Sequence, residues 1–327
     1  MVNGNMLRKT RISALATYVP PTILDNHKLS QMVDTTDEWI LQRTGIKTRH
    51  VVEKGVATSD MGKEAALRAL AQAGLTPDDI DVVIVGTTTP DMFFPSTAAL
   101  VQHKIGAAKC WGFDLAGACS GFNFSLSVAS QLVSTGKHQR ALVVGADTMS
   151  SIIDYTDRTT CVLFGDGAGA VVLVPSLEPG ILAARLHADG AHAPTLCVPG
   201  QVRNGAIAGS PFVQMDGGHV FRFAVKVLAD TAVETLAAAG LAPGAIDWLI
   251  PHQANLRIMD ATAKKLHLPH DRMIVTVDRH ANTSAASIPL ALDTAVRDGR
   301  IRAGQHVMLA GVGGGFTWGA VLVRWHP

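Results

Sequence analysis

The chain has 327 residues, which is enough for two domains or one large one. Its 28 Lys+Arg and 27 Asp+Glu nearly cancel, and a formal net charge of +1 argues against a general nucleic-acid binder. Hydrophobic residues make up 47% of the chain and charged residues 17%, a composition typical of folded globular proteins.

The targeting signals and the cysteines point to a reducing compartment. The first twenty residues contain no apolar signal segment, and no apolar run approaches the roughly 18 residues of a membrane span. The four cysteines form no CxxC pair, which excludes a zinc ribbon, and they are too few for a disulfide framework. We therefore expect a cytoplasmic protein with neither a membrane partner nor a bound metal.

Two blocks of the chain repeat in the same order. AGLTPDDID at 73–81 corresponds to AGLAPGAID at 239–247; each follows an Ala/Leu-rich helical pattern and precedes an apolar strand-like run. The segments 111–147 and 274–313 form a second pair, each with the pattern strand, small-residue turn, helix, Gly turn, strand. Two pairs at one offset indicate a duplication.

The duplication predicts the domain organisation. The Pro/Gly-bearing stretch VPSLEPG lies between the repeats and suggests one half at 1–178 and a second at 179–327. Strands alternate with helices in both halves, which predicts an α/β protein with mixed, mostly parallel sheets. Two similar halves packed together would place helices between their sheets.

Chemically useful residues follow four predicted strands. Cys119 follows WGFDLAGA, His252 follows IDWLIP, Asn282 follows MIVTVDRHA, and 313–315 is a Gly run after HVMLAGV. Ligands of open α/β sheets bind beyond the carboxyl ends of strands, so we expect these residues to converge.

Each of these residues also has a purely structural interpretation. Cys119 lies in GACSGF before a helical pattern, where a helix N-terminus favours the thiolate, but buried cysteines are often structural. His252 alone would most often be an ordinary polar residue, and Asn282 alone a helix N-cap. The Gly run is either a tight turn or a donor of backbone N–H groups to an oxyanion.

The other cysteines and one glycine motif are given structural interpretations. Cys110, Cys161 and Cys197 are predicted to be structural, with Cys161 in a core strand within TTCVLFG. The segment 165–170, GDGAGA, matches a dinucleotide-binding fingerprint, which requires a strand before it and a helix after it. Strand-like residues stand on both sides, so we predict a strand–turn–strand corner and no NAD site.

Six ordered motifs resemble one known family. TTDEWILQRTGI, GACSGF, FGDGAGA, PHQANLRI, NTSAASIP and GGGFTWGA resemble the β-ketoacyl-acyl-carrier-protein synthase III enzymes, which initiate type II fatty-acid synthesis. The resemblance extends from about Lys9 to Trp325. It implies a thiolase-like fold, in which two similar halves form a duplicated five-layered α-β-α-β-α arrangement, and it implies a homodimer.

The resemblance assigns catalytic roles by matching motifs. It implies that Cys119 is the acyl-accepting nucleophile, that His252 and Asn282 activate a malonyl thioester, and that the N–H groups of Cys119 and Gly314 form an oxyanion hole. Elongating synthases use a second His where Asn282 stands, and thiolases use a second Cys near the C-terminus, which is missing after Cys197.

The resemblance also implies binding residues for both substrates. It places Trp39 and Arg43 against the coenzyme A adenine, and the full coenzyme A set is Thr35, Trp39, Arg43, Arg158, Gly217, Ala254 and Asn255. The implied docking set for an acyl carrier protein (ACP) is Gln253, Ala254, Asn255, Leu256, Arg257, Lys264 and Lys265. Phe94, inserted by a partner subunit, and Val312 are the implied determinants of the acyl pocket.

The implied reaction is ping-pong and needs no cofactor, since acyl-CoA is a substrate. An acetyl or other short acyl group moves to Cys119, and decarboxylative condensation with malonyl-ACP then gives 3-oxoacyl-ACP, CO2 and CoA. Two positions depart from the family pattern: Ala281 replaces a usual Gly, and Val312 replaces a frequent Phe. Val312 keeps open a related condensing enzyme of polyketide or quinolone synthesis with another primer. A further alternative is a catalytically silent carrier-protein partner.

Overall fold

A computed structural model describes residues 8–326, and it contains two main sheets. The first has the order β1-β7-β6-β4-β5. Its strands are β1 (Lys9–Tyr18), β7 (Gly167–Ser176), β6 (Ala141–Asp147), β4 (Val82–Gly86) and β5 (Trp111–Leu115). Strand β4 is parallel to β5 and β6, whereas β7 is antiparallel to β6 and β1.

The second sheet has the order β13-β14-β15-β8. Its strands are β13 (Trp248–Pro251), β14 (His306–Gly313), β15 (Thr317–Arg324) and β8 (Ile181–Ala188). Strands β13 and β14 are parallel and the other pairs are antiparallel. The chain passes from the first sheet to the second between Ser176 and Ile181, where the sequence suggests the domain boundary.

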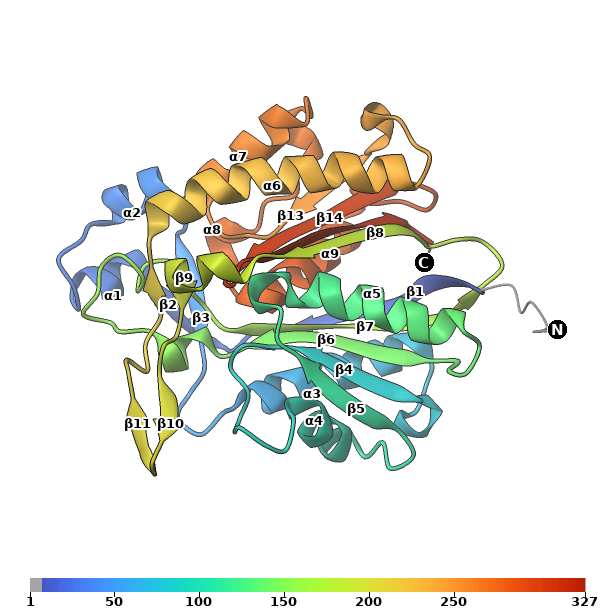
Figure 1. Cartoon of the computed structure of the whole chain (residues 1–327), viewed down its shortest axis with the longest axis horizontal. Coiled ribbons are helices and arrows are strands. Elements are labelled where there is room, and N and C mark those ends of the chain that lie inside the picture. The colour runs from blue at the N-terminus through green and yellow to red at the C-terminus, as the bar shows by residue number, and fades with distance from the viewer. Residues whose placement is uncertain (1–7, 327) are drawn as a thin grey trace.

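Helices separate and cover the two sheets, which gives five layers (Figure 1). Helices α3 (Thr58–Ala73) and α4 (Thr97–Ile105) cover the outer face of the first sheet. Helices α5 (Gly121–Ser134) and α9 (Ser287–Arg297) lie between the sheets, and α6 (Gly217–Ala238) covers the second sheet with α7 (Leu256–Lys265) packed against it. The predicted α-β-α-β-α arrangement is confirmed.

Matching turn chemistry forms the first repeated unit in each half. Helix α3 ends at Gly74 and helix α6 at Ala239 and Gly240, and both glycines have left-handed backbones with φ of 64° and 70°. A 3-10 turn with Pro in its first turn then leads into a strand: η1 (Pro77–Asp79) before β4, and η5 (Pro243–Ala245) before β13. A left-handed Gly and a Pro soon after it end a helix sharply, which explains why the motif was visible in the sequence.

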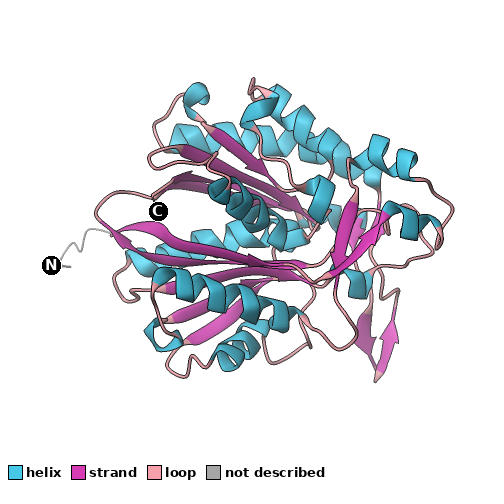
Figure 2. Cartoon of the chain, turned by 180° about the vertical axis from the view of Figure 1, so that it is seen from behind, coloured by secondary structure: helices cyan, strands magenta, loops and turns pink. Residues whose placement is uncertain are grey.

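Smaller elements lie at the carboxyl ends of the central strands. Strands β2 (Thr22–Asp25) and β3 (Thr48–Val51) pair beside α1 (Asn26–Ser30) and α2 (Asp37–Thr44), and β9 (Leu196–Cys197) pairs with β12 (Gln214–Met215). The hairpin of β10 (Gln201–Arg203) and β11 (Ala206–Ala208) projects from the body (Figure 2). The remaining short elements are α8 (Val277–His280), η2 (Ala118–Ser120), η3 (Met149–Ile152), η4 (Gly190–Thr195), η6 (His270–Arg272) and η7 (Ser284–Ala286).

Two predicted strands are wrong. The run MIVTVD forms only an isolated parallel bridge between Met273 and Leu249, and the chain turns into α8 at Val277. The run TTCVLFG forms turns and one bridge between Phe164 and Asn282, so Cys161 is buried but lies in no strand. In the GDGAGA segment, only Gly165 and Asp166 lie in the connection before the strand, and Gly167 to Ala170 are the first residues of β7, with no helix after them.

The described part of the chain has neither a membrane-spanning helix nor a cluster of metal ligands. Over residues 8–326, no helix has the length and apolar character of a membrane span. Within the same residues, no group of three His, Cys, Asp or Glu side chains is placed to hold a metal ion. Residues 1–7, part of the segment inspected for a signal sequence, and residue 327 lie outside the description.

Candidate active site

Cys119 lies on η2, between the end of β5 and the start of α5. Its side chain is buried, and its backbone is pressed against the end of β14. A Cβ on Gly313 would approach the Cys119 backbone nitrogen to 2.5 Å, so only glycine allows this contact. The repeated segments 111–147 and 274–313 therefore meet at Cys119 and Gly313, as the sequence suggested.

The surroundings of Cys119 favour the neutral thiol over the thiolate. Burial raises the pKa of Cys119 to about 12, and the nearby Asp147 carboxylate adds to the rise, while the Ser284 hydroxyl and the Cys119 N–H oppose it. We expected the N-terminus of α5 to favour the thiolate. Burial outweighs that effect. The low-dielectric surroundings therefore oppose formation of the thiolate that attacks the substrate.

His252 follows β13 and is buried at 2% exposure. Its backbone N–H donates to Ala310 O over 2.7 Å, and its Nδ1 lies 2.6 Å from the Ser287 hydroxyl oxygen. The Gln253 N–H donates to the same oxygen over 3.4 Å, so the Ser287 hydroxyl can donate to Nδ1 and leave the proton on Nε2. Burial lowers the pKa of His252 to about 3, so the ring is neutral at physiological pH.

Asn282 is held by contacts on both sides of its backbone. Its N–H donates to Leu163 O over 2.9 Å, and its O accepts from the Gly165 N–H over 3.0 Å. Its side-chain Oδ1 accepts from the Ser284 N–H over 2.9 Å, which orients the amide and leaves Nδ2 as the donor for the cavity. The preceding Ala281 has φ 57° and ψ −157°, so the position that departs from the family pattern does need a backbone that favours glycine.

Cys119, His252 and Asn282 converge on one cavity of about 120 Å³. The cavity opens outward past Gly217, Ala254 and Asn255, three of the positions expected to bind coenzyme A. It shares further residues with an outer groove that contains Trp39, Arg43 and Arg257. The outer groove and the inner cavity therefore share walls, and the thiol lies at the inner cavity.

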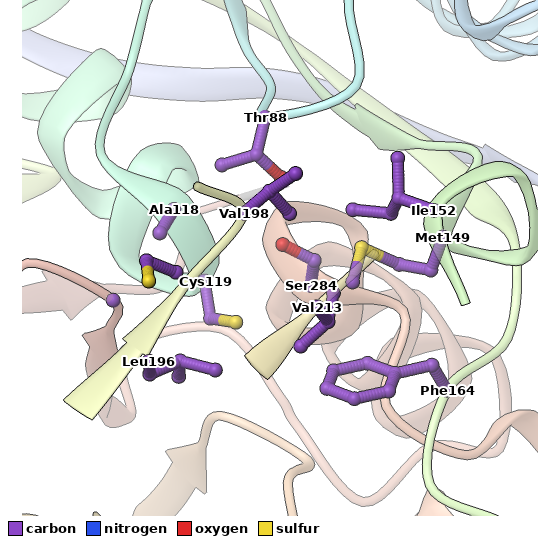
Figure 3. A pocket seen from close by; sticks show the side chains of 12 residues that line it. Thr88, Ala118, Cys119, Met149, Ile152, Phe164, Leu196, Val198, Val213 and Ser284 are labelled. Atoms are coloured by element: carbon purple, nitrogen blue, oxygen red, sulfur yellow. The ribbon is translucent and has the colours of Figure 1, made fainter. Parts of the chain in front are cut away.

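A second cavity, of about 230 Å³, lies on the far side of Cys119 (Figure 3). Its walls are mostly apolar; they include Met149, Ile152, Phe164, Leu196, Val198 and Val213. Gly314 borders this cavity, whereas Val312 borders the inner cavity with His252 and Asn282. Cys197, predicted only as a structural cysteine, also lines the second cavity.

Trp39 lies between two arginines at the outer groove. The Arg43 guanidinium lies 4.9 Å from the indole centroid and that of Arg158 lies 5.0 Å away. Arg158 also donates to Asp34 O over 3.0 Å. The hydroxyl oxygen of the neighbouring Thr35 is buried and has no hydrogen-bond partner among the described residues. The groove thus combines an aromatic face with cationic groups, whereas Thr35 and Arg158 do not line it.

The expected carrier-protein set divides between surface and interior. Arg257, Lys264 and Lys265 are exposed on α7, and Lys265 forms an ion pair of 2.7 Å with Asp230. Gln253 does not belong to this surface, because it is 1% exposed. Its amide donates to Pro251 O and Ile274 O and accepts from the N–H groups of 276 and 277, so it fixes the turn after His252.

The Phe94 side chain is exposed in the single chain. It is 84% exposed in the loop after β4, beside Phe93 at 82%, and it borders neither cavity. Its predicted contact with an acyl pocket requires a partner subunit and stays a prediction.

The five-layered fold and the convergence of Cys, His and Asn define the class of thiolase-fold condensing enzymes, which are acyltransferases. Family models described as 3-oxoacyl-[acyl-carrier-protein (ACP)] synthase III match residues 113–190 and, for the C-terminal part, 236–325. The chain belongs to the 3-oxoacyl-ACP synthase III family.

Solved structures of high similarity support this membership. The 3-oxoacyl-[acyl-carrier-protein] synthase III of Aquifex aeolicus VF5 is 41% identical with a TM-score of 0.92, over 97% of this chain and 100% of that one. The Thermus thermophilus synthase III is 44% identical with a TM-score of 0.90, over 97% and 99%. The priming β-ketosynthase of the R1128 polyketide pathway is 36% identical with a TM-score of 0.91, over 98% of each chain.

Proposed function

We propose that this enzyme initiates type II fatty-acid synthesis in the cytoplasm by condensing a short acyl-CoA with malonyl-ACP. The observation that carries the proposal is a cavity that is lined by Cys119, His252 and Asn282 and shares walls with the Trp39 groove.

The first half-reaction loads the enzyme. The Cys119 sulfur attacks the acyl-CoA thioester carbon, the bond from that carbon to the CoA sulfur breaks, and the thiol proton ends on the released CoA. The outer groove is lined by three arginines, Arg43, Arg222 and Arg257, and Arg158 lies over the Trp39 ring. Their positive charges complement the CoA phosphates. The acyl chain then lies in the second cavity, whose apolar walls exclude water from the thioester.

The second half-reaction uses neutral donors. Loss of CO2 from malonyl-ACP leaves an enolate, whose oxygen accepts from His252 Nε2–H and Asn282 Nδ2–H. Its carbon attacks the acyl-Cys119 carbonyl, and the Cys119 and Gly314 N–H groups stabilise the resulting oxyanion. The bond to Sγ then breaks and releases 3-oxoacyl-ACP, and the Cys119 thiolate takes up one proton from water, with no redox change and no cofactor.

The assembly we propose is a homodimer formed along β5. This strand is at the edge of the first sheet, with Trp111 50% exposed, and an unpaired edge is a template for pairing with another chain. Phe93 and Phe94 add apolar surface on the loop after β4. A partner seated there would bring its own Phe94 toward this chain's second cavity.

One observation favours a second candidate. Val312 leaves the inner cavity wider than a Phe would, and the priming ketosynthase of a polyketide pathway is 36% identical over the whole chain. A related condensing enzyme with a larger primer therefore remains the alternative.

Intact-protein mass spectrometry tests the proposal. Incubation with acetyl-CoA should add roughly 42 Da to the wild-type enzyme and nothing to Cys119→Ser, because a hydroxyl supplies no thiolate. Addition of malonyl-ACP should then remove the adduct and release acetoacetyl-ACP. An enzyme that gains no adduct from any acyl-CoA is a silent homologue and overturns the proposal.

A further inference from the structure

Ser284 is a buried serine whose hydroxyl has no hydrogen-bond partner. Its side chain is 1% exposed, and its Oγ pairs with nothing in the described chain at ordinary hydrogen-bond geometry. A buried serine normally donates to a nearby backbone carbonyl, because an unpaired polar group is costly in the interior. The free hydroxyl therefore needs an explanation.

The backbone of Ser284 is held in an unfavourable conformation. Its φ is 49°, a left-handed value that non-glycine residues rarely adopt. Two hydrogen bonds fix it there: the Ser284 N–H donates to Asn282 Oδ1 over 2.9 Å, and the Ala285 N–H donates to Asp147 Oδ2 over 3.0 Å. Asp147 is itself fully buried and accepts from the N–H groups of Thr88 and Thr89, so the conformation is fixed from both halves of the chain.

This conformation directs the hydroxyl into the cavity that holds the thiol. Ser284 and Cys119 line the same second cavity, and their side chains enter it from η7 and η2, which pack together (Figure 3). Apart from these two residues and Thr88, the walls are nearly apolar. Thr88 already donates to Asp147 Oδ1 over 3.1 Å, so the Ser284 hydroxyl is the free donor on this wall.

We propose that Ser284 is a further catalytic residue, whose hydroxyl donates a hydrogen bond to the Cys119 sulfur when that sulfur becomes a thiolate. A neutral thiol is a weak hydrogen-bond acceptor, so the hydroxyl gains a strong acceptor only when the sulfur becomes a thiolate. Catalytic hydrogen bonds are often loose before charge develops and tighten when it does. In agreement with this geometry, the Ser284 hydroxyl opposes the rise that burial causes in the pKa of Cys119.

The assignment rests on the proposed role of Cys119 as the nucleophile, so the test begins with a reaction that needs neither CoA nor ACP. Iodoacetamide alkylates the Cys119 thiolate: a carbon–sulfur bond forms, iodide leaves, and the thiol proton goes to water. Peptide mass mapping separates this product from alkylation at the other three cysteines. The rate at fixed pH reports the thiolate fraction.

Ser284→Ala should slow Cys119 alkylation about tenfold between pH 7 and 9, the consequence of a pKa that is higher by about one unit. Ser284→Gly removes the same hydroxyl but relieves the left-handed backbone, so an equal loss in both variants assigns the effect to the hydroxyl. Thr283→Val is the matched control: its neighbouring hydroxyl is also buried and unpartnered but borders neither cavity, and its rate should equal that of wild type.

Acyl loading supplies the second measurement. With acetyl-CoA, Ser284→Ala should lower the maximal loading rate about tenfold. The half-saturating concentration should stay unchanged, because Ser284 does not line the outer groove proposed to bind CoA. Wild-type alkylation rates in both Ser284 variants, or an equal loss in Thr283→Val, would overturn the assignment. Failure of the wild-type enzyme to load any acyl group would overturn the proposed function instead.

Discussion

The two ends of the Asn282 amide do different work. Oδ1 accepts from the Ser284 N–H, and in the proposed mechanism Nδ2 is left to donate to the enolate. Asn282→Asp should keep the first contact and lose the donor, so the variant should fold and load acetyl-CoA normally. Decarboxylation of malonyl-ACP should fall by about 100-fold or more, measured as CO2 release. Unchanged CO2 release would show that Asn282 does not contact the enolate.

Ala281 is a local source of strain beside the site. Its φ of 57° and ψ of −157° lie where a Cβ is unfavourable, and the residue is fully buried. Ala281→Gly should raise the free energy of unfolding by about 1 kcal/mol, measured by urea denaturation at pH 7. A lower denaturation midpoint would mean that the Ala281 methyl contributes more through packing than it costs in backbone strain.

One buried histidine and one half-buried histidine should make the fold acid-sensitive. Burial lowers the pKa of His252 to about 3 and that of His280 to about 4, whereas both titrate near 6.5 when unfolded. Below pH 6.5 the unfolded chain binds more protons than the native one, so stability falls by about 1.4 kcal/mol per pH unit for each histidine. Buried Asp166 has a raised pKa and opposes this trend at more acidic pH.

The acid sensitivity can be measured from urea midpoints at pH 7 and pH 5. The wild-type midpoint should be clearly lower at pH 5, and His280→Asn should lose about half of that difference. An equal difference in both proteins would show that His280 is not buried in its neutral form.

Residue types and motif spacing predicted Cys119, His252 and Asn282, but not what supports them. Ser284 was invisible because its role depends on a left-handed backbone and a missing partner, neither of which the letters NTSAAS encode alone. Gln253 was misassigned to a docking surface, since PHQAN does not reveal that four backbone groups surround its amide.

At the scale of elements, helix α7 carries the charges expected to steer an acidic carrier protein. Arg257 also borders the outer groove, and its guanidinium lies 5.6 Å from the centroid of the Phe221 ring. Reversing the charge at Arg257 should therefore impair the reaction with both acetyl-CoA and malonyl-ACP. Lys264 is exposed on the same helix and borders none of the cavities of the active site. Lys264→Glu should raise KM for malonyl-ACP several-fold and leave acetyl-CoA loading unchanged.

A matched reversal separates docking from net charge. Lys137→Glu, in the turn after α5, changes the total charge equally and should leave both kinetic constants unchanged. A similar rise in KM for Lys137→Glu and Lys264→Glu would mean that carrier proteins sense only the net charge of the enzyme.

Sequence periodicity predicted the long elements well and the short ones poorly. Helices α3 and α6 were recognisable because a left-handed glycine follows each helix, and a Pro comes a few residues later at the start of a 3-10 turn. The run at 273–276 is apolar like a strand, but its ladder is reduced to one bridge because the chain must turn into α8 and place Asn282. A segment is apolar when it is buried, whether or not its backbone pairs with a neighbouring strand. An apolar run alone therefore does not predict a strand.

At the scale of the whole molecule, the proposed homodimer would make primer length depend on two chains. The second cavity of about 230 Å³ belongs to one chain, and Phe94, 84% exposed, is available to close the cavity of a partner. Val312 widens the inner cavity beside His252 and Asn282 rather than the end of the acyl cavity. A closed end limits chain length even where the entrance is wide.

We therefore expect acetyl- and propionyl-CoA to be preferred over octanoyl-CoA by at least about tenfold in kcat/KM, a difference of roughly 1.4 kcal/mol. Phe94→Thr should reduce that preference and favour longer or branched primers, while light scattering still reports a dimer, because β5 and not Phe94 supplies the paired edge. Tyr18→Phe, on the far strand β1, controls for a general loss of activity. A wild-type enzyme that prefers octanoyl-CoA would show that Phe94 does not close the pocket, and the polyketide-type alternative would then explain the site better.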